Sequence, residues 1–300
     1  MDGKKSVSRL KVSVMILIGL FILSFMLAGL MSASVKLGNV AKIKINGIIL
    51  TEDANLWTQS VASSDFKEFI GKAEKDNAIK AILIEIDSPG GAPVASAEIA
   101  DAIAGAKKPT VALIREQGTS GAYWAASAAD KIVAHPLSMT GSIGVIGSYL
   151  QFSGLLRNYN ISYERFVGGE YKDMGSPFRE PTSAERQFLQ GSIDEIHYYF
   201  IGSVAKNRNM TFEAVEKIAD GKFYTGMQAK KLNLVDELGG EEKAEELLKQ
   251  MANATEIYYA EYGKKETLLG LLSKVISQQS YFVGVGIGSS FVKNELEVRT

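Results

Sequence analysis

The 300-residue sequence contains no cysteine, and this absence excludes several kinds of chemistry. Such a chain can form no disulfide, no thiolate nucleophile and no cysteine-ligated zinc site. Only two histidines occur, His135 and His197, and their spacing forms no HxxxH metal motif. The formal net charge is −1, so no excess of one sign attracts nucleic acid. We therefore expect no metal, no cofactor and no nucleic-acid partner.

Charge is also absent from one long segment near the N-terminus. Residues 12–35 carry no charged side chain, and Lys4, Lys5, Arg9 and Lys11 precede them. About 20 apolar residues cross a bilayer as a helix, so residues 12–35 predict one transmembrane anchor. The positive-inside rule keeps residues 1–11 in the cytoplasm and places the rest of the chain on the extracytoplasmic side of the cell membrane.

A cleaved signal peptide is the alternative interpretation of the same segment. The small residues Ser-Ala-Ser at positions 32–34 resemble a cleavage site. The apolar run is nevertheless longer than the ~7–15 residues of a signal-peptide core, which favours an uncleaved anchor.

Residues 36–262 alternate between strand and helix patterns, which predicts one α/β domain with a mainly parallel sheet and helices on its faces. Gly47 makes the first strand pattern either one strand or a tight hairpin. We expect Ser183 to cap the longest helix, and Thr211 and Thr225 to open two short ones. The strand patterns cover residues 39–50, 79–91, 109–116 and 131–134, and the main helix patterns cover 63–77, 94–106, 120–130 and 182–209. Residues 263–300 add an apolar helix (266–278) and a glycine-rich apolar tail (281–292), which is too short to cross a bilayer.

Three glycine-marked turns follow these strands: DSPGG (87–91), GTSGA (118–122) and TGSIGVIG (140–147). In open α/β sheets the loops at the carboxyl ends of parallel strands converge on the functional site. Ser120 falls at a strand-to-helix junction, where neighbouring backbone N–H groups can form an oxyanion hole. The alternative is that Ser120 is an ordinary helix N-cap and that the glycines only form turns. The Gly-x-Ser-x-Gly elbow is absent.

A nucleophilic serine needs a base, and the residues alone leave its identity open. His135 precedes Pro136 with no obvious carboxylate to orient it, and His197 lies within a long helical pattern. A lysine can serve only when its amine is neutral, because an ammonium group accepts no proton. Lys172, in the segment GGEYKDMGSPFRE (168–180), is a candidate, although spacing alone does not select it from the 33 basic residues.

The segments DSPGG, TSGAYWAASAADKIVAHPLSMTGSIGVIG and EYKDMGSPFRE together resemble the signal peptide peptidase A family. This family comprises membrane-anchored serine–lysine proteases with the Clp-protease/crotonase fold, and the resemblance covers roughly residues 40–250. It implies that Ser120 is the nucleophile, that Lys172 is the base, and that Ser142 orients the lysine amine. It further implies an oxyanion hole formed by Gly121 with Gly90 or Gly91. His135 occupies a position that the family does not use, and Ala122 replaces a glycine that many members carry.

The resemblance also implies an activity. We expect an endopeptidase that degrades remnant signal peptides and other apolar peptides near the lipid bilayer, assembled as a homo-oligomeric ring in which a site can borrow a neighbour's residues. Three alternatives remain: a Clp-fold protease dedicated to one membrane partner, a crotonase-like CoA-binding protein, and a non-catalytic scaffold on the same fold.

Overall fold

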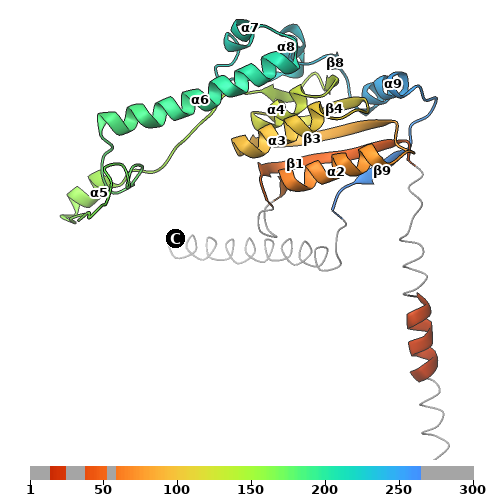
Figure 1. Cartoon of the computed structure of the whole chain (residues 1–300), viewed down its shortest axis with the longest axis horizontal. Coiled ribbons are helices and arrows are strands. Elements are labelled where there is room, and N and C mark those ends of the chain that lie inside the picture. The colour runs from red at the N-terminus through yellow and green to blue at the C-terminus, as the bar shows by residue number, and fades with distance from the viewer. Residues whose placement is uncertain (1–13, 25–37, 53–58, 265–300) are drawn as a thin grey trace, which may run out of the picture. The chain divides into compact units, whose positions relative to one another are not determined.

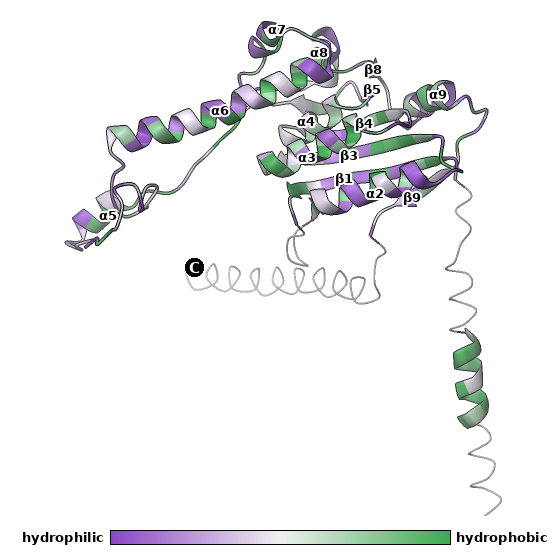
Figure 2. Cartoon of the chain, in the orientation of Figure 1, coloured by the Kyte–Doolittle hydropathy of each residue, from purple (hydrophilic) through white to green (hydrophobic). Residues whose placement is uncertain are grey.

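The computed structural model describes residues 14–24, 38–52 and 59–264 (Figure 1). The chain divides into two units, Met1–Leu37 and Gly38–Thr300. In the first unit, residues 14–24 form a helix, which Figure 2 shows to be hydrophobic along its length. Within the described ranges, no helix is long and apolar enough to cross a membrane. The rest of the predicted anchor and the predicted elements at 266–292 lie outside the described residues.

The second unit is built on a mostly parallel sheet, which confirms the predicted mixed α/β class. Its main order is β2-β1-β3-β4-β5-β8, with β9 beside β1, and among the strand pairs of the described residues only β6–β7 is antiparallel. β1 continues past Gly47 with a shift in register between Asn46 and Ile48, so the hairpin alternative is wrong. The strands are β1 (Val40–Leu50), β2 (Ser60–Ala62), β3 (Ala81–Gly91), β4 (Thr110–Thr119), β5 (Lys131–Ala134), β6 (Met139–Gly141), β7 (Phe223–Thr225), β8 (Glu237–Leu238) and β9 (Tyr259–Tyr262).

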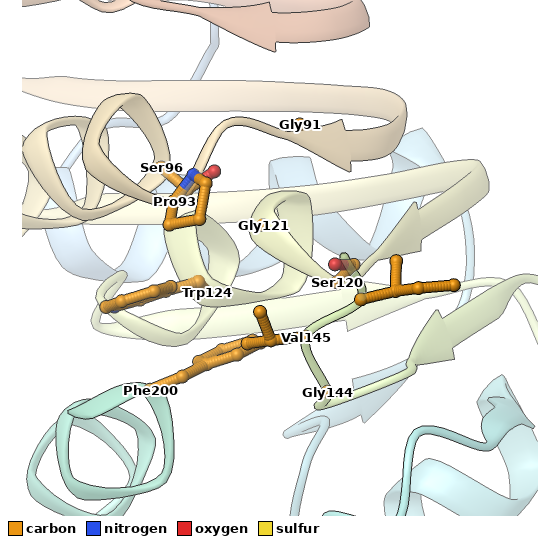
Figure 3. Close-up of a pocket in the computed structure, with 10 residues that line it drawn as sticks. Gly91, Pro93, Ser96, Ser120, Gly121, Trp124, Gly144, Val145 and Phe200 are labelled. Atoms are coloured by element: carbon orange, nitrogen blue, oxygen red, sulfur yellow. The ribbon is translucent and has the colours of Figure 1, made fainter. Parts of the chain in front are cut away.

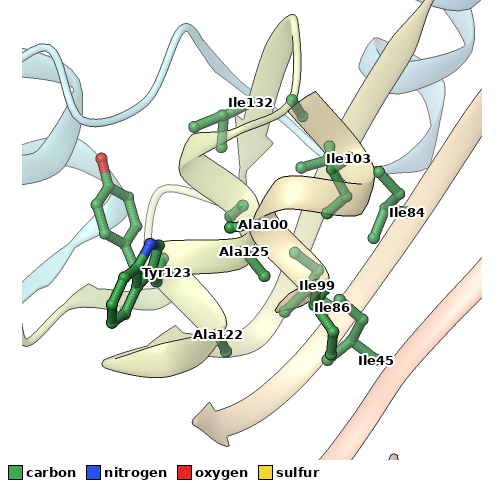
Figure 4. Close-up of a cluster of buried hydrophobic side chains, with 14 of the residues drawn as sticks. Ile45, Ile84, Ile86, Ile99, Ala100, Ile103, Ala122, Tyr123, Ala125 and Ile132 are labelled. Carbon is green, nitrogen blue, oxygen red and sulfur yellow. The ribbon is translucent and has the colours of Figure 1, made fainter. Parts of the chain in front are cut away.

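Helices cover both faces of this sheet, and alternate residues of β3 show the division. Ile84 and Ile86 belong to the larger core, with α2, α3 and α4 packed above them, as Figure 4 shows for α3 and α4. Leu83 faces the opposite side and packs in a smaller core with Leu248 of α9. A strand buried on both faces is apolar at nearly every position, which explains the continuous apolar runs in the sequence. The helices are α2 (Ser63–Lys75), α3 (Pro93–Ala104), α4 (Gly121–Ser127), α5 (Ser153–Asn158), α6 (Ser183–Asn207), α7 (Phe212–Glu216), α8 (Gly226–Lys231) and α9 (Glu241–Ala252).

The longest helix, α6, is buried mainly near its C-terminal end, where Phe200, Ile201 and Val204 pack into the larger core. Its N-terminal half runs out past the sheet, with α5 near its beginning (Figure 1). The N-cap is Thr182 in a capping box, so the assignment of the cap to Ser183 was wrong by one residue. Thr211 and Thr225 cap α7 and α8 as predicted.

Candidate active site

Ser120 lies between the end of β4 and the start of α4, with φ 53° and ψ −125°. Residues other than glycine rarely adopt this backbone conformation, because their Cβ atom crowds the backbone. Backbone strain of this kind is found most often at functional sites. Two backbone hydrogen bonds hold it in place. The Ser120 N–H donates to the Gly141 carbonyl at 2.8 Å, and the Ser120 carbonyl accepts from the Trp124 N–H at 2.9 Å.

Ser142 also has a positive φ, and it directly follows Gly141, whose carbonyl binds the Ser120 N–H. Its φ is 50°, its N–H donates to the Lys222 carbonyl at 2.9 Å, and its hydroxyl donates to the Gly221 carbonyl at 3.1 Å. The other non-glycine residues with positive φ in the described parts of the chain are all asparagines, which tolerate this conformation best. Among the described residues, Ser120 and Ser142 are therefore the only ones other than glycine and asparagine that have a positive φ.

The predicted oxyanion glycines are in close contact with neighbouring atoms, which leaves no room for a side chain. A Cβ on Gly90 (φ 95°) would lie 2.6 Å from the Gly121 nitrogen, and one on Gly121 would lie 2.1 Å from Ser96 Oγ. The Gly90 N–H donates to Ser88 Oγ at 3.1 Å. Gly91, by contrast, lines the pocket with Gly121. The geometry thus distinguishes the two glycines that the sequence left equivalent.

The pocket in front of Ser120 combines apolar side chains with the polar groups of two serines and the backbone of three glycines. Figure 3 shows the rings of Trp124 and Phe200 on one side and Ser120 on the other. The two rings stack with centroids 4.5 Å apart, and Trp124 Nε1 donates to Ser203 Oγ at 2.7 Å, which ties α4 to α6. The lining residues are Gly91, Pro93, Ser96, Ser120, Gly121, Trp124, Gly144, Val145, Ile146 and Phe200.

None of the candidate bases lines this pocket within one chain. Lys172 is exposed in the segment between α5 and α6. His135 lines a different cavity, and its Nδ1 accepts the Leu137 N–H at 3.2 Å. His197 lies in α6, where its Nε2 is buried without a partner among the described residues. The structure therefore brings together Ser120, Ser142, Gly91 and Gly121, but not Lys172.

Charged residues that the sequence analysis missed surround the turn that carries Lys172. Asp173 accepts hydrogen bonds from Arg179 and Arg165. These bonds lower the pKa of its carboxyl to about 2, and Arg179 contributes more than Arg165. Arg179 also binds Glu185 and lowers the pKa of that carboxyl to about 2, with help from the Thr182 N–H. Of these residues, only Glu185 could have been found from the sequence, because Thr182-x-x-Glu185 has the spacing of a capping box. No metal-binding group of His, Cys, Asp or Glu side chains occurs in the described part of the chain.

The fold and the site define a class: an α/β protein with a strained serine at a strand-to-helix junction, between two glycine turns and beside a pocket that two aromatic rings line on one side. Residues 102–255 match the model of peptidase family S49, a stretch that contains Ser120, Ser142 and Lys172. The chain belongs to this family, so it is a peptidase by descent.

Named relatives agree with this membership. A Methanocaldococcus jannaschii protein provisionally named a protease is 40% identical over 219 residues, which cover 72% of this chain and 68% of that protein. An Enterococcus faecium protein provisionally named signal peptide peptidase SppA is 36% identical over 76% of this chain and 68% of its own length. Protease 4 of Salmonella typhi is 31% identical over 78% of this chain, but only 38% of that longer protein is covered.

Proposed function

We propose that the protein is a serine endopeptidase of the Clp-protease/crotonase fold in which Ser120 is the nucleophile and Lys172 the general base. The observation that carries this proposal is the strained backbone of Ser120, held beside the pocket between Gly91 and Gly121. Strain of this kind persists only where the surrounding structure enforces it, as it does at many reactive groups.

The proposed reaction follows from the chemistry of these groups. The neutral Lys172 amine accepts the proton of Ser120 Oγ while Oγ attacks the scissile carbonyl carbon. The N–H groups of Gly91 and Gly121 stabilise the negative oxygen that develops. The amine then returns the proton to the leaving nitrogen, and water hydrolyses the acyl-enzyme with the same lysine as base. The Ser142 hydroxyl hydrogen-bonds the amine and orients it.

A neighbouring copy of the chain supplies the lysine in this proposal. Lys172 lies outside the Ser120 pocket of its own chain, so a complete site needs a second source of this side chain. The segment between β6 and α6 exposes many large apolar side chains, which is typical of a protein interface. They include Ile146, Tyr149, Leu150, Phe152, Leu155, Tyr159, Phe166 and Phe178. We infer that this segment packs on the next subunit of a homo-oligomeric ring.

The proposed substrates are apolar peptides near the membrane, including remnant signal peptides. The apolar lining contributed by Trp124, Phe200 and Val145 supports this choice, because it favours apolar over charged side chains. The proposed anchor at residues 12–35 would hold the peptidase unit at the extracytoplasmic surface of the cell membrane. The name of the Enterococcus faecium relative points to the same substrate class.

Labelling with a serine-reactive fluorophosphonate tests the proposal directly. The detergent-solubilised full-length protein should be labelled and should cleave an apolar peptide, whereas Ser120→Ala should do neither. Lys172→Ala should be inactive, and Lys172→Arg should stay inactive because a guanidinium remains protonated. His135→Ala should keep most of the activity. An inactive His135→Ala beside an active Lys172→Ala would refute the assigned base.

A further inference from the structure

Four charged side chains hold the turn that carries Lys172 against the beginning of α6. Asp173, which follows Lys172 directly, accepts from two arginines. Arg165 Nη2 donates to Asp173 Oδ1 at 2.6 Å. Arg179 binds both carboxylate oxygens, through Nε to Oδ2 at 2.8 Å and Nη2 to Oδ1 at 2.9 Å. The carboxylate of Asp173 is therefore fixed from two sides.

Arg179 forms a second fork with Glu185, the fourth member of the cluster. Its Nη1 donates to Glu185 Oε2 at 2.8 Å, and its Nη2 donates to Glu185 Oε1. Nη1 also donates to the Glu180 carbonyl at 3.2 Å. A guanidinium has five N–H groups in one plane, and these contacts give each of them an acceptor. A lysine ammonium could not span two carboxylates in this way.

Glu185 itself is immobilised by the first turn of α6. Its Oε2 accepts the Thr182 N–H at 2.8 Å, while Thr182 Oγ1 accepts the Glu185 N–H at 3.2 Å. The side chains of Glu185, Asp173 and Arg179 are only 3%, 13% and 18% exposed. Charged hydrogen bonds shielded from water in this way are stronger than surface ion pairs, and removing one partner leaves the other unsatisfied.

The same helix reaches the element that carries Ser120. Phe200 of α6 stacks on Trp124 of α4, and Ser203 accepts the indole N–H. Glu185 and Phe200 are separated by about 22 Å along the helix at 1.5 Å per residue. One rigid element thus connects the nucleophile of a chain with the turn that presents its lysine.

We propose that Arg179 is a positioning residue for Lys172, clamping the Lys172–Asp173 turn to the capping box of α6 so that the amine is presented in one orientation. This inference rests on the proposed function, in which Lys172 is the base. Transfer of a proton requires donor and acceptor within hydrogen-bond reach, and a displacement of 1 Å can cost about 100-fold in rate. A turn released from α6 would still carry the lysine but would hold it loosely.

The test compares kcat and KM of the full-length protein with those of Arg179→Gln and Arg179→Lys. Both variants should lower kcat by roughly 10- to 100-fold and leave KM within about twofold, because the peptide pocket is untouched. Asp173→Asn added to Arg179→Gln should lower kcat no further, since both changes break one linkage. Lys72→Gln is the control: Lys72 pairs with Glu68 on α2, outside the segment between β6 and α6, both side chains are largely exposed, and its kcat should be unchanged.

Lys172→Ala, measured in parallel, separates the two possible failures. If Lys172→Ala is inactive while Arg179→Gln keeps the wild-type kcat, only the positioning role is overturned. If Lys172→Ala is active, the proposed function fails and this inference fails with it. Full recovery in Arg179→Lys would show that any cation suffices and would overturn the clamp. Should Arg179→Gln not fold, judged by melting and oligomer size, a wild-type kcat in Asp173→Asn overturns the proposal and a matching loss supports it.

Discussion

At the scale of single residues, the contacts around Ser120 are closer than a turn alone requires. Gly90 and Gly91 at the end of β3 lie close to Gly121 at the start of α4, and each of the three would collide with neighbouring atoms if it carried a Cβ. The glycines of these turns therefore indicate that backbone segments approach closely, and not only that the turns need conformational freedom. The same approach turns the Gly91 and Gly121 backbone toward one pocket.

The contact between Gly121 and Ser96 gives a residue-scale prediction. Gly121→Ala should destabilise the protein by roughly 1–3 kcal/mol and abolish most peptidase activity, because its Cβ would lie 2.1 Å from Ser96 Oγ. Adding Ser96→Gly should recover part of the stability, since it removes the nearest clashing atoms. Urea denaturation of both single variants and the double variant measures the coupling. Strictly additive free energies of unfolding would contradict this packing.

At the scale of elements, α6 has two ends with different tasks. Its C-terminal end is anchored in the larger core, whereas its N-terminal half is mostly exposed apart from Glu185, which holds the Lys172 turn through charged hydrogen bonds. The capping box explains why the helix begins where it does, and it also holds Glu185 in the position that Arg179 needs.

Because these carboxylates must be ionised, the attachment of the Lys172 turn to α6 should weaken at low pH. Asp173 and Glu185 have pKa values of about 2, below the ordinary 3.8 and 4.5. Their contribution to stability is complete above the ordinary pKa values and is lost as the pH falls through about 2. Asp173→Asn should therefore lower the melting temperature at pH 7, and the difference from wild type should shrink toward pH 2. A difference that stays constant over this range would show that the carboxylate charge is irrelevant.

At the scale of the whole molecule, one chain does not bring all the residues of the proposed site together. Ser120, Ser142 and the two glycines converge, whereas Lys172 lies in the segment between α5 and α6, which Arg179 binds to the first turn of α6. If the lysine comes from a neighbour, two inactive variants should complement each other.

Mixing Ser120→Ala with Lys172→Ala before assembly tests this arrangement. In a random equimolar ring about a quarter of the sites would combine an intact serine with an intact neighbouring lysine. Co-expressed and co-purified rings should therefore recover roughly that share of the wild-type activity, while each variant alone stays inactive. The double variant Ser120→Ala/Lys172→Ala co-expressed with Lys172→Ala is the control and should stay inactive. Absence of recovery in rings shown to contain both chains would contradict a shared site.

The proposed anchor is tested at the same scale. Full-length protein should stay with the membrane after washing with high salt and carbonate, because residues 12–35 are uncharged and long enough to span a bilayer. A variant that begins near Lys36 should be recovered without detergent. Mature chains that begin near Val35 would show that the segment is a cleaved signal instead.

The sequence by itself determined the features that depend on neighbouring residues. The parallel sheet was predictable because strands buried on both faces must be apolar throughout. The beginnings of α7 and α8 at Thr211 and Thr225 were predictable because an N-cap side chain bonds to the first turn of its own helix. Ser120 was recognisable as a candidate nucleophile because Gly118 and Gly121 mark a tight turn around it. Only the tertiary structure decided that Ser88 takes the Gly90 N–H, that Lys172 lies away from Ser120, and that Arg179 joins Asp173 to Glu185. The hydrogen bonds and packing responsible depend on side-chain orientation and on where distant elements meet, which local patterns do not encode.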